Sequence, residues 1–193
     1  EADDVVYTWA GPEIAVASTK AYTTQLMCLS MLALKAAFIK GTISASDYKK
    51  YLCELNSIPE KVQQILEDKA SIQRFVSKNY NKQKVFFIGR QYDSATSLEC
   101  ALKLKEVSYM HSEAFAAGEM KHGPIALIDT DTLVVATATV PELYEKLASN
   151  IIEVKSRGAS TFVITQDDSG AFSSSADEIV KIVVAAAENN EPV

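Results

Sequence analysis

The chain has 193 residues, of which 48% are hydrophobic and 23% are charged, and this is the composition of an ordinary globular protein. That length corresponds to one domain, or to one domain and part of another. The net charge of −6 and the lack of a basic stripe argue against a nucleic-acid-binding protein. A site for a small anion remains compatible with this charge, because it needs only local amides and one or two cations.

Three cysteines, Cys28, Cys53 and Cys100, are too few and too scattered for a disulfide framework. None has a partner at metal-ligand spacing and the chain has only two histidines, so we expect reduced thiols, no metal site and no cofactor. The acidic N-terminus resembles no signal peptide, and together with reduced thiols this indicates a cytoplasmic protein.

The first predicted element is a helix from Thr19 to Lys40, which Gly41 ends. It contains the longest apolar stretch of the chain, from Leu26 to Ile39, interrupted by Ser30 and Lys35. That stretch is too short and too interrupted for a membrane span. Because the helix is apolar on more than one face, we expect it to be deeply buried.

Two further helices are expected before the composition changes. One runs from Asp47 to Leu55, and another starts at Ser57-Ile58-Pro59-Glu60, which offers a serine cap and a proline in the first turn. A short helix then ends near Asn79. Residues 1–70 are therefore predicted to be mostly helical.

From about residue 71, apolar strands alternate with helices. Strands are predicted at 84–88, 132–136, 161–165 and 178–184, with helices at 94–110 and 141–157. Strands without polar alternation are typical of a parallel sheet that is covered on both faces, so we predict a doubly wound α/β domain. Residues 112–124 are polar and punctuated by glycine, and they are interpreted as a loop.

Ligands of such folds gather where the carboxyl ends of strands lead into helices. The first such segment, Ile88 to Ser97, offers a glycine, an arginine, hydroxyls and free helix amides that suit a phosphate or a sugar. The same residues would serve equally well as a turn with a serine or aspartate cap.

The following helix carries Glu99, Lys103 and Glu106 on one face, at i, i+4 and i+7. They form either a solvated Glu–Lys ladder or a carboxylate base held beside a cation. His122 lies in the glycine-rich loop and can exchange a proton near neutral pH, although a lone histidine is a weak signal. His111 is placed at the end of the helix, where it would complement the helix dipole.

The segment Gly11 to Lys20 precedes the apolar helix. Ser18 or Thr19 would cap that helix. Capping accounts for one hydroxyl, and it explains neither the second hydroxyl nor Lys20.

Three segments, Gly11–Thr23, Ala101–Glu106 and Gly118–Pro124, together resemble the signature segments of the glutamine–fructose-6-phosphate aminotransferase (glucosamine-6-phosphate synthase) family, in the same order and approximate spacing. The resemblance implies two tandem sugar-isomerase (SIS) domains, each a doubly wound, flavodoxin-like sheet, behind an N-terminal glutaminase domain. It implies that residues 1–70 are the C-terminal end of the first SIS domain with a helical linker. Residues 71–193 would be the second SIS domain, truncated at its C-terminus.

The resemblance also implies roles for individual residues. Glu106 would carry a proton between C1 and C2 of the sugar, and Lys103 would assist at the sugar oxygens. His122 would help to open the sugar ring in the site of a neighbouring subunit, which implies a homodimer. The sugar site would be lined by Val16, Ala17 and Ser18.

The implied enzyme is a cytoplasmic, isomerising aminotransferase that binds no nucleic acid and no membrane. It would make glucosamine-6-phosphate from fructose-6-phosphate and glutamine-derived ammonia, for UDP-N-acetylglucosamine biosynthesis. We expect this segment to be inactive alone, because the family's glutaminase, phosphate loop and terminal lysine lie outside it. Gln91 and Cys100 depart from the family pattern. The alternatives are an enzyme like fructosamine-6-phosphate deglycase and a non-catalytic, sugar-phosphate-binding SIS module of a regulator.

Overall fold

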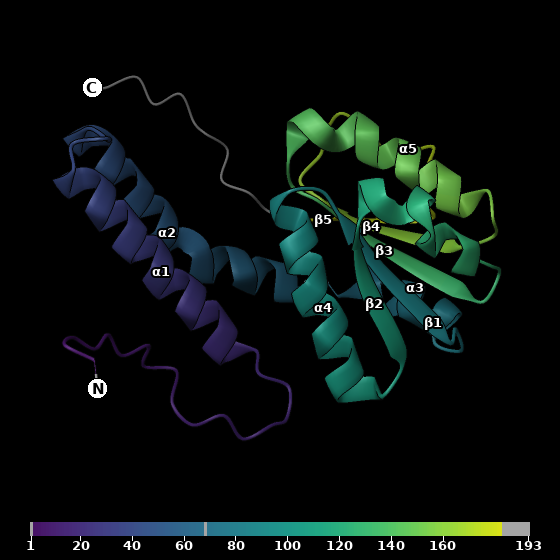
Figure 1. Ribbon diagram of the computed structural model, residues 1–193, viewed down its shortest axis with the longest axis horizontal. Helices are drawn as coiled ribbons and strands as arrows, with labels where there is room; N and C mark the ends of the chain where they lie inside the picture. The colour runs from purple at the N-terminus through teal and green to yellow at the C-terminus, as the bar shows by residue number, and fades with distance from the viewer. Residues whose placement is uncertain (1, 68, 183–193) are drawn as a thin grey trace. The chain divides into compact units, whose positions relative to one another are not determined.

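The computed structural model describes residues 2–67 and 69–182. These residues form two compact units, one that ends at Gln64 and one that begins at Ile65. The helices and strands of both are drawn in Figure 1.

The first unit holds α1 (Lys20–Ile39) and most of α2 (Ala45–Glu67). Gly41, with a φ of +70°, follows α1 in the left-handed conformation that ends many helices, as predicted. The rings of Phe38 and Tyr48 stack at a centroid distance of 4.6 Å, and they join the end of α1 to the start of α2. The Lys35 ammonium lies 5.8 Å from each ring centroid and adds a cation–π contact.

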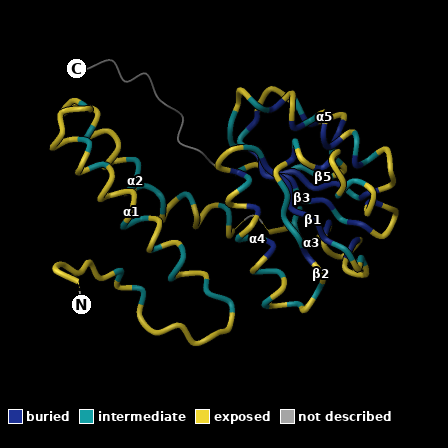
Figure 2. The backbone as a smooth tube through the Cα atoms, in the orientation of Figure 1, coloured by how far each residue is buried: buried dark blue, intermediate teal, exposed yellow. Residues whose placement is uncertain are grey.

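The prediction that α1 is deeply buried is wrong for this structure, because α1 has no buried residue. Leu29 is 62% exposed and Leu32 is 51% exposed. Apolar side chains surround the helix, and the single neighbouring helix of the unit covers only part of that surface. By length and composition alone, this 20-residue helix could also cross a bilayer, with a mean hydropathy of 1.3. Figure 2 shows α1 and α2 in the colours of intermediate and exposed residues.

The two helices expected on either side of Ser57 are one continuous helix, α2, with Pro59 inside it. The Ser57 hydroxyl donates to the Glu54 carbonyl oxygen at 2.8 Å, so it does not cap a new helix. Lys61 and Glu54 form an ion pair of 2.9 Å across the proline. These contacts help to offset the cost of an internal proline, about 3 kcal/mol.

The second unit contains a parallel sheet of five strands within the described residues, in the order β2-β1-β3-β4-β5. Its main elements are α3 (Ala70–Asn79), β1 (Lys84–Gly89), α4 (Tyr92–Ser108), β2 (His111–Ala116), β3 (Thr132–Ala138), α5 (Tyr144–Lys155), β4 (Ser160–Thr165) and β5 (Glu178–Lys181). Three short 3₁₀ helices are η1 (Ala117–His122), η2 (Pro124–Leu127) and η3 (Pro141–Leu143). This is the flavodoxin-like strand order, and the predicted fold class is confirmed.

Alternate residues of each strand point to opposite faces of the sheet. Phe86 and Val134 pack with Leu147 and Ile151 of α5 on one face. On the other face Val85 and Phe87 pack with Ala101 of α4, while α3 contributes Phe75 against Phe162 of β4. Buried residues gather in these strands (Figure 2).

Strand β2 (His111–Ala116) overlaps the segment interpreted as a loop, and that interpretation is wrong for residues 112–116. The strand is polar and stands at an edge of the sheet, so it lacks the continuous apolar pattern of the central strands. The helix before it ends at Ser108, and Tyr109 follows with a φ of +60°. His111 therefore starts a strand, opposite Lys84 of β1, and does not complement the end of a helix.

The remaining boundaries follow the predictions closely. The predicted helix 141–157 is divided into η3 and α5. Strand β5 covers 178–181, and residues 183–184 of the predicted strand lie outside the described residues.

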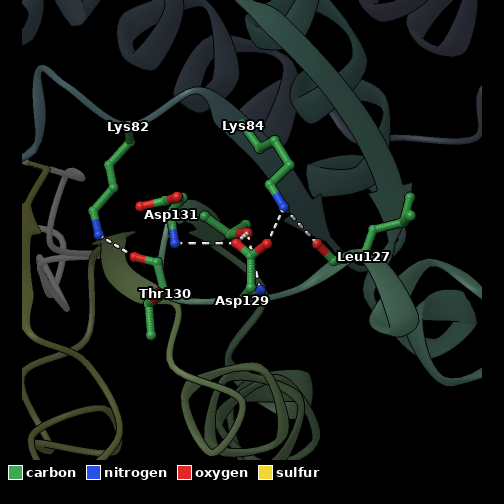
Figure 3. A network of polar contacts seen from close by, with 7 residues as sticks. Lys82, Lys84, Leu127, Asp129, Thr130 and Asp131 are labelled. Atoms are coloured by element: carbon green, nitrogen blue, oxygen red, sulfur yellow. Dashed lines mark hydrogen bonds and ion pairs between the residues drawn. The ribbon is translucent and has the colours of Figure 1, made fainter.

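A polar network holds the amino ends of β1 and β3 together (Figure 3). The Lys84 ammonium bonds to the Asp129 carboxylate and donates to the Leu127 carbonyl oxygen at 3.2 Å. The Thr132 hydroxyl donates to the same carboxylate at 2.8 Å. Lys82 donates to the Thr130 carbonyl oxygen in the same turn.

Candidate active site

The turn from β1 into α4 is very tight. A Cβ atom added to Gly89 would lie 2.4 Å from the carbonyl carbon of Asp93, so glycine is required for close approach of the helix to the strand. The helix begins with Gln91 at a φ of 52° and without a side-chain cap hydrogen bond. The predicted serine or aspartate cap is therefore absent at this described helix end.

The Asp93 side chain instead crosses to the loop after β3. Its carboxylate accepts from the Thr139 backbone N–H at 2.8 Å and from the Thr139 hydroxyl at 2.6 Å. Gln166, after β4, donates to the Thr139 carbonyl oxygen at 2.9 Å. Side-chain hydrogen bonds thus link the carboxyl ends of three strands.

The three charged residues predicted to share a face of α4 do so. The Lys103 ammonium lies 2.7 Å from a carboxylate oxygen of Glu106 and 3.4 Å from one of Glu99. The exposed fractions of the three side chains are 24% (Glu99), 21% (Lys103) and 23% (Glu106), so the group is less solvated than a surface ladder. The hydrogen bond to Glu106 raises the pKa of Lys103, which therefore stays charged at neutral pH.

Glu106 and His122 lie at opposite ends of the sheet. Glu106 is in the last turn of α4, beside the amino ends of β1 and β2, about 20 Å along the helix from Asp93. His122 is the exposed last residue of η1, beyond the carboxyl end of β2. A single copy of this unit does not bring the two side chains together.

The candidate sugar-binding residues precede α1. Val16 is 84% exposed, and Ala17 and Ser18 are half-buried. Thr19 is the N-cap residue of α1, but its side chain makes no capping hydrogen bond. Its backbone N–H donates to the Glu13 carboxylate at 3.2 Å.

Glu13 thus replaces the predicted hydroxyl cap, and its negative charge suits a helix N-terminus. The Lys20 ammonium, which capping left unexplained, donates to the Pro12 carbonyl oxygen at 2.7 Å. Both contacts fold the segment Gly11 to Lys20 back onto itself.

The sequence did not predict which side chains would bond to the loop between β1 and α4. Arg90 donates to the Asn150 side-chain oxygen of α5 at 2.8 Å. Asn150 lies 60 positions later in the chain, on the face of α5 that carries Leu147 and Ile151. A polar residue on that apolar face could have marked Asn150 as unusual, although it does not identify Arg90 as its partner.

Comparisons with known proteins agree with the fold. A family model described as the SIS domain matches residues 79–193. The chain is 50% identical, over 94% of its length, to the isomerising glutamine–fructose-6-phosphate aminotransferase of Caldanaerobacter subterraneus subsp. tengcongensis, and 49% identical to that of Clostridium tetani. It spans 30% of the length of each of these relatives.

A solved structure, the C-terminal domain of glucosamine-fructose-6-phosphate aminotransferase from Francisella tularensis, matches with a TM-score of 0.82 and 36% identity. The match covers 89% of this chain and 48% of that one. The resemblance found in the three sequence segments is confirmed by these matches. With its parallel sheet in the order β2-β1-β3-β4-β5 and its match over residues 79–193, the chain belongs to the SIS domain family.

Proposed function

We propose that this chain is part of the isomerase half of a glutamine–fructose-6-phosphate aminotransferase, which makes glucosamine-6-phosphate from fructose-6-phosphate and glutamine-derived ammonia. The observation that carries the proposal is the hydrogen bond of 2.7 Å between Lys103 and Glu106 on a partly buried helix face. Relatives of that name, at 49–50% identity, support it.

Converting a ketose into an aldose derivative moves one proton between adjacent carbons. In our proposal the Glu106 carboxylate takes the proton from one carbon and returns it to the next, so the residue ends each turnover unchanged. Lys103 stays charged because Glu106 raises its pKa. It therefore acts as a hydrogen-bond donor that positions the Glu106 carboxylate and polarises a sugar oxygen, and not as a second base.

We assign ring opening to His122 of a neighbouring protomer in a homodimer. Its exposed position at the far end of the sheet from Glu106 supports a role in another copy's site. The sugar site would be lined by Val16, Ala17 and Ser18, in a segment that the Glu13 and Lys20 contacts hold folded.

Residues 1–70 would be the end of a first SIS domain and its linker, and residues 71–193 most of a second. We place the enzyme in the cytoplasm. The exposed apolar surface of α1 would then face protein rather than lipid, since Ser30 and Lys35 interrupt it. A glutaminase domain upstream in the complete protein would supply the ammonia.

The test uses the complete protein that contains this segment. Given fructose-6-phosphate and glutamine, it should release glucosamine-6-phosphate and glutamate in equal amounts. Turnover of fructosamine-6-phosphate alone would instead identify a deglycase. Sugar-phosphate binding without any turnover would identify a regulatory module.

A further inference from the structure

The Arg90 side chain connects three elements of the second unit. Arg90 directly follows β1, and its Nη2 atom donates to the Asn150 side-chain oxygen of α5 at 2.8 Å. Its two terminal nitrogens lie beside Gly118 of η1, where an added Cβ would stand 3.5 Å from each. Asn150 is 7% exposed, so the guanidinium is anchored on a buried group. One side chain thus links the end of β1 and the middle of α5 to the turn that carries His122.

The turn η1 is held from two sides. Ala117 and Met120, each 0% exposed, fix one side of it in the core. At Gly118 it meets the guanidinium of Arg90 instead. His122 is the exposed last residue of the turn, four positions after Gly118 and about 8 Å along the axis of a regular 3₁₀ helix. The direction in which His122 leaves the turn therefore depends on both contacts.

Stability alone does not account for an arginine at this position. Within the described parts of the chain, Arg90 forms no ion pair at 4.0 Å or less. Its Nε atom is buried and has no hydrogen-bond partner among the same residues. A partly buried charge without a counter-ion and a buried donor without an acceptor both cost free energy, and an uncharged side chain would avoid both costs. The contact with η1 is what a smaller, uncharged side chain would not provide.

We propose that Arg90 is a positioning residue for ring opening: it holds η1 so that His122 is presented to the sugar bound by a neighbouring protomer. This inference rests on the proposed function. Ring opening breaks the bond between C2 and the ring oxygen of fructose-6-phosphate. The ring oxygen gains a proton and the C2 hydroxyl loses one as the ketone forms, so the step needs no reagent besides a well-placed acid–base group.

The first test compares two substrates of the complete protein that contains this segment. One is fructose-6-phosphate, and the other is its 5-deoxy analogue, which lacks the hydroxyl that closes the ring and is always open. Arg90→Met should lower kcat/KM for fructose-6-phosphate by about tenfold to a hundredfold, as expected when a catalytic group is displaced by about 1 Å. The value for the open analogue should change less than about twofold, because no ring has to open.

Two further variants complete this comparison. Asn150→Ala removes the anchor of the guanidinium and should reproduce the selective loss in part. Arg74→Met removes an arginine from an exposed position of α3 and should leave both substrates unaffected. Equal losses for the two substrates in Arg90→Met would reduce Arg90 to a structural role and overturn the proposal. So would a selective loss of the same size in Arg74→Met.

The second test needs no turnover. The chain has two histidines, His111 at the start of β2 and His122 in η1, so each imidazole C–H signal can be assigned by NMR in the 193-residue chain. Arg90→Met should shift the His122 signal and leave that of His111 in place. An unshifted His122 signal would refute the positioning role. The proposed function fails separately, if the unsubstituted complete protein forms no glucosamine-6-phosphate.

Discussion

The Asp93 carboxylate, after β1, accepts both the backbone N–H and the hydroxyl of Thr139, after β3, at 2.8 and 2.6 Å. Asp93 is 4% exposed, and Thr139 is partly buried. This pair ties together two strand ends that are 46 positions apart in the chain.

Asp93→Ala should lower the free energy of unfolding by about 1–3 kcal/mol, because it leaves two partly buried donors of Thr139 without their acceptor. Urea denaturation would measure the change. Asp93→Asn keeps one oxygen acceptor and should cost less than the alanine substitution. Equal losses from the two would show that the carboxylate's acceptor role is not what stabilises the turn.

Gly89→Ala should also destabilise the fold, by about 3 kcal/mol, the upper part of the usual range for overpacking. The new Cβ would stand 2.4 Å from the backbone of Asp93, and a backbone atom cannot move aside cheaply. Gly118→Ala is the matched control, since its Cβ would meet its nearest neighbour at an ordinary 3.5 Å. Thermal melting of both variants should separate them clearly, and similar melting temperatures would contradict the tight turn.

The pair Lys84–Asp129 predicts a pH dependence of stability. The hydrogen bond from Lys84, with a second from Thr132, holds the pKa of Asp129 below its usual range. The stabilisation is therefore fully present above the pKa of an unfolded aspartate, about 4, and is lost as the pH falls through the lower folded value.

Asp129→Asn should thus destabilise the protein at pH 7, and the difference from the parent should shrink as the pH drops below about 4. Urea denaturation at several pH values would show this. Asp131 joins the same network only through its backbone N–H (Figure 3), so Asp131→Asn should leave the pH profile unchanged. A difference for Asp129→Asn that stays constant with pH would exclude an electrostatic origin.

The central strands could be predicted because each is a continuous apolar run, buried on both faces. Strand β2 could not, since an edge strand that begins His111-Ser112-Glu113 has the composition of a loop. The helix boundary expected at Ser57 failed for a related reason: local cap residues were outweighed by contacts across Pro59.

For the candidate site, the sequence predicted the contacts within one helix but not those between distant segments. Spacings of three and four residues placed Glu99, Lys103 and Glu106 on one face, and the structure has them in contact. The contacts Asp93–Thr139 and Arg90–Asn150 join residues far apart in the chain, and no local pattern encodes such pairs.

The sharpest prediction concerns Glu106 in the complete enzyme. Glu106→Gln keeps the size of the side chain but removes the basic oxygen that would carry the proton. It should slow isomerisation by the ~10²–10⁴-fold typical of a lost general base, while sugar binding largely survives, because the loss falls on the transition state. Single-turnover incorporation of solvent deuterium at C1 or C2 would measure it.

Glu99→Gln is the matched control, because Glu99 lies two turns before Glu106 on the same helix and contacts the same lysine, Lys103. Its distance to Lys103, 3.4 Å against 2.7 Å for Glu106, makes it the weaker partner. If Glu106 transfers the proton, Glu99→Gln should leave most of the exchange rate intact. Small and equal losses from the two substitutions would mean that both carboxylates only neutralise Lys103, and the proton carrier would have to be sought on another element.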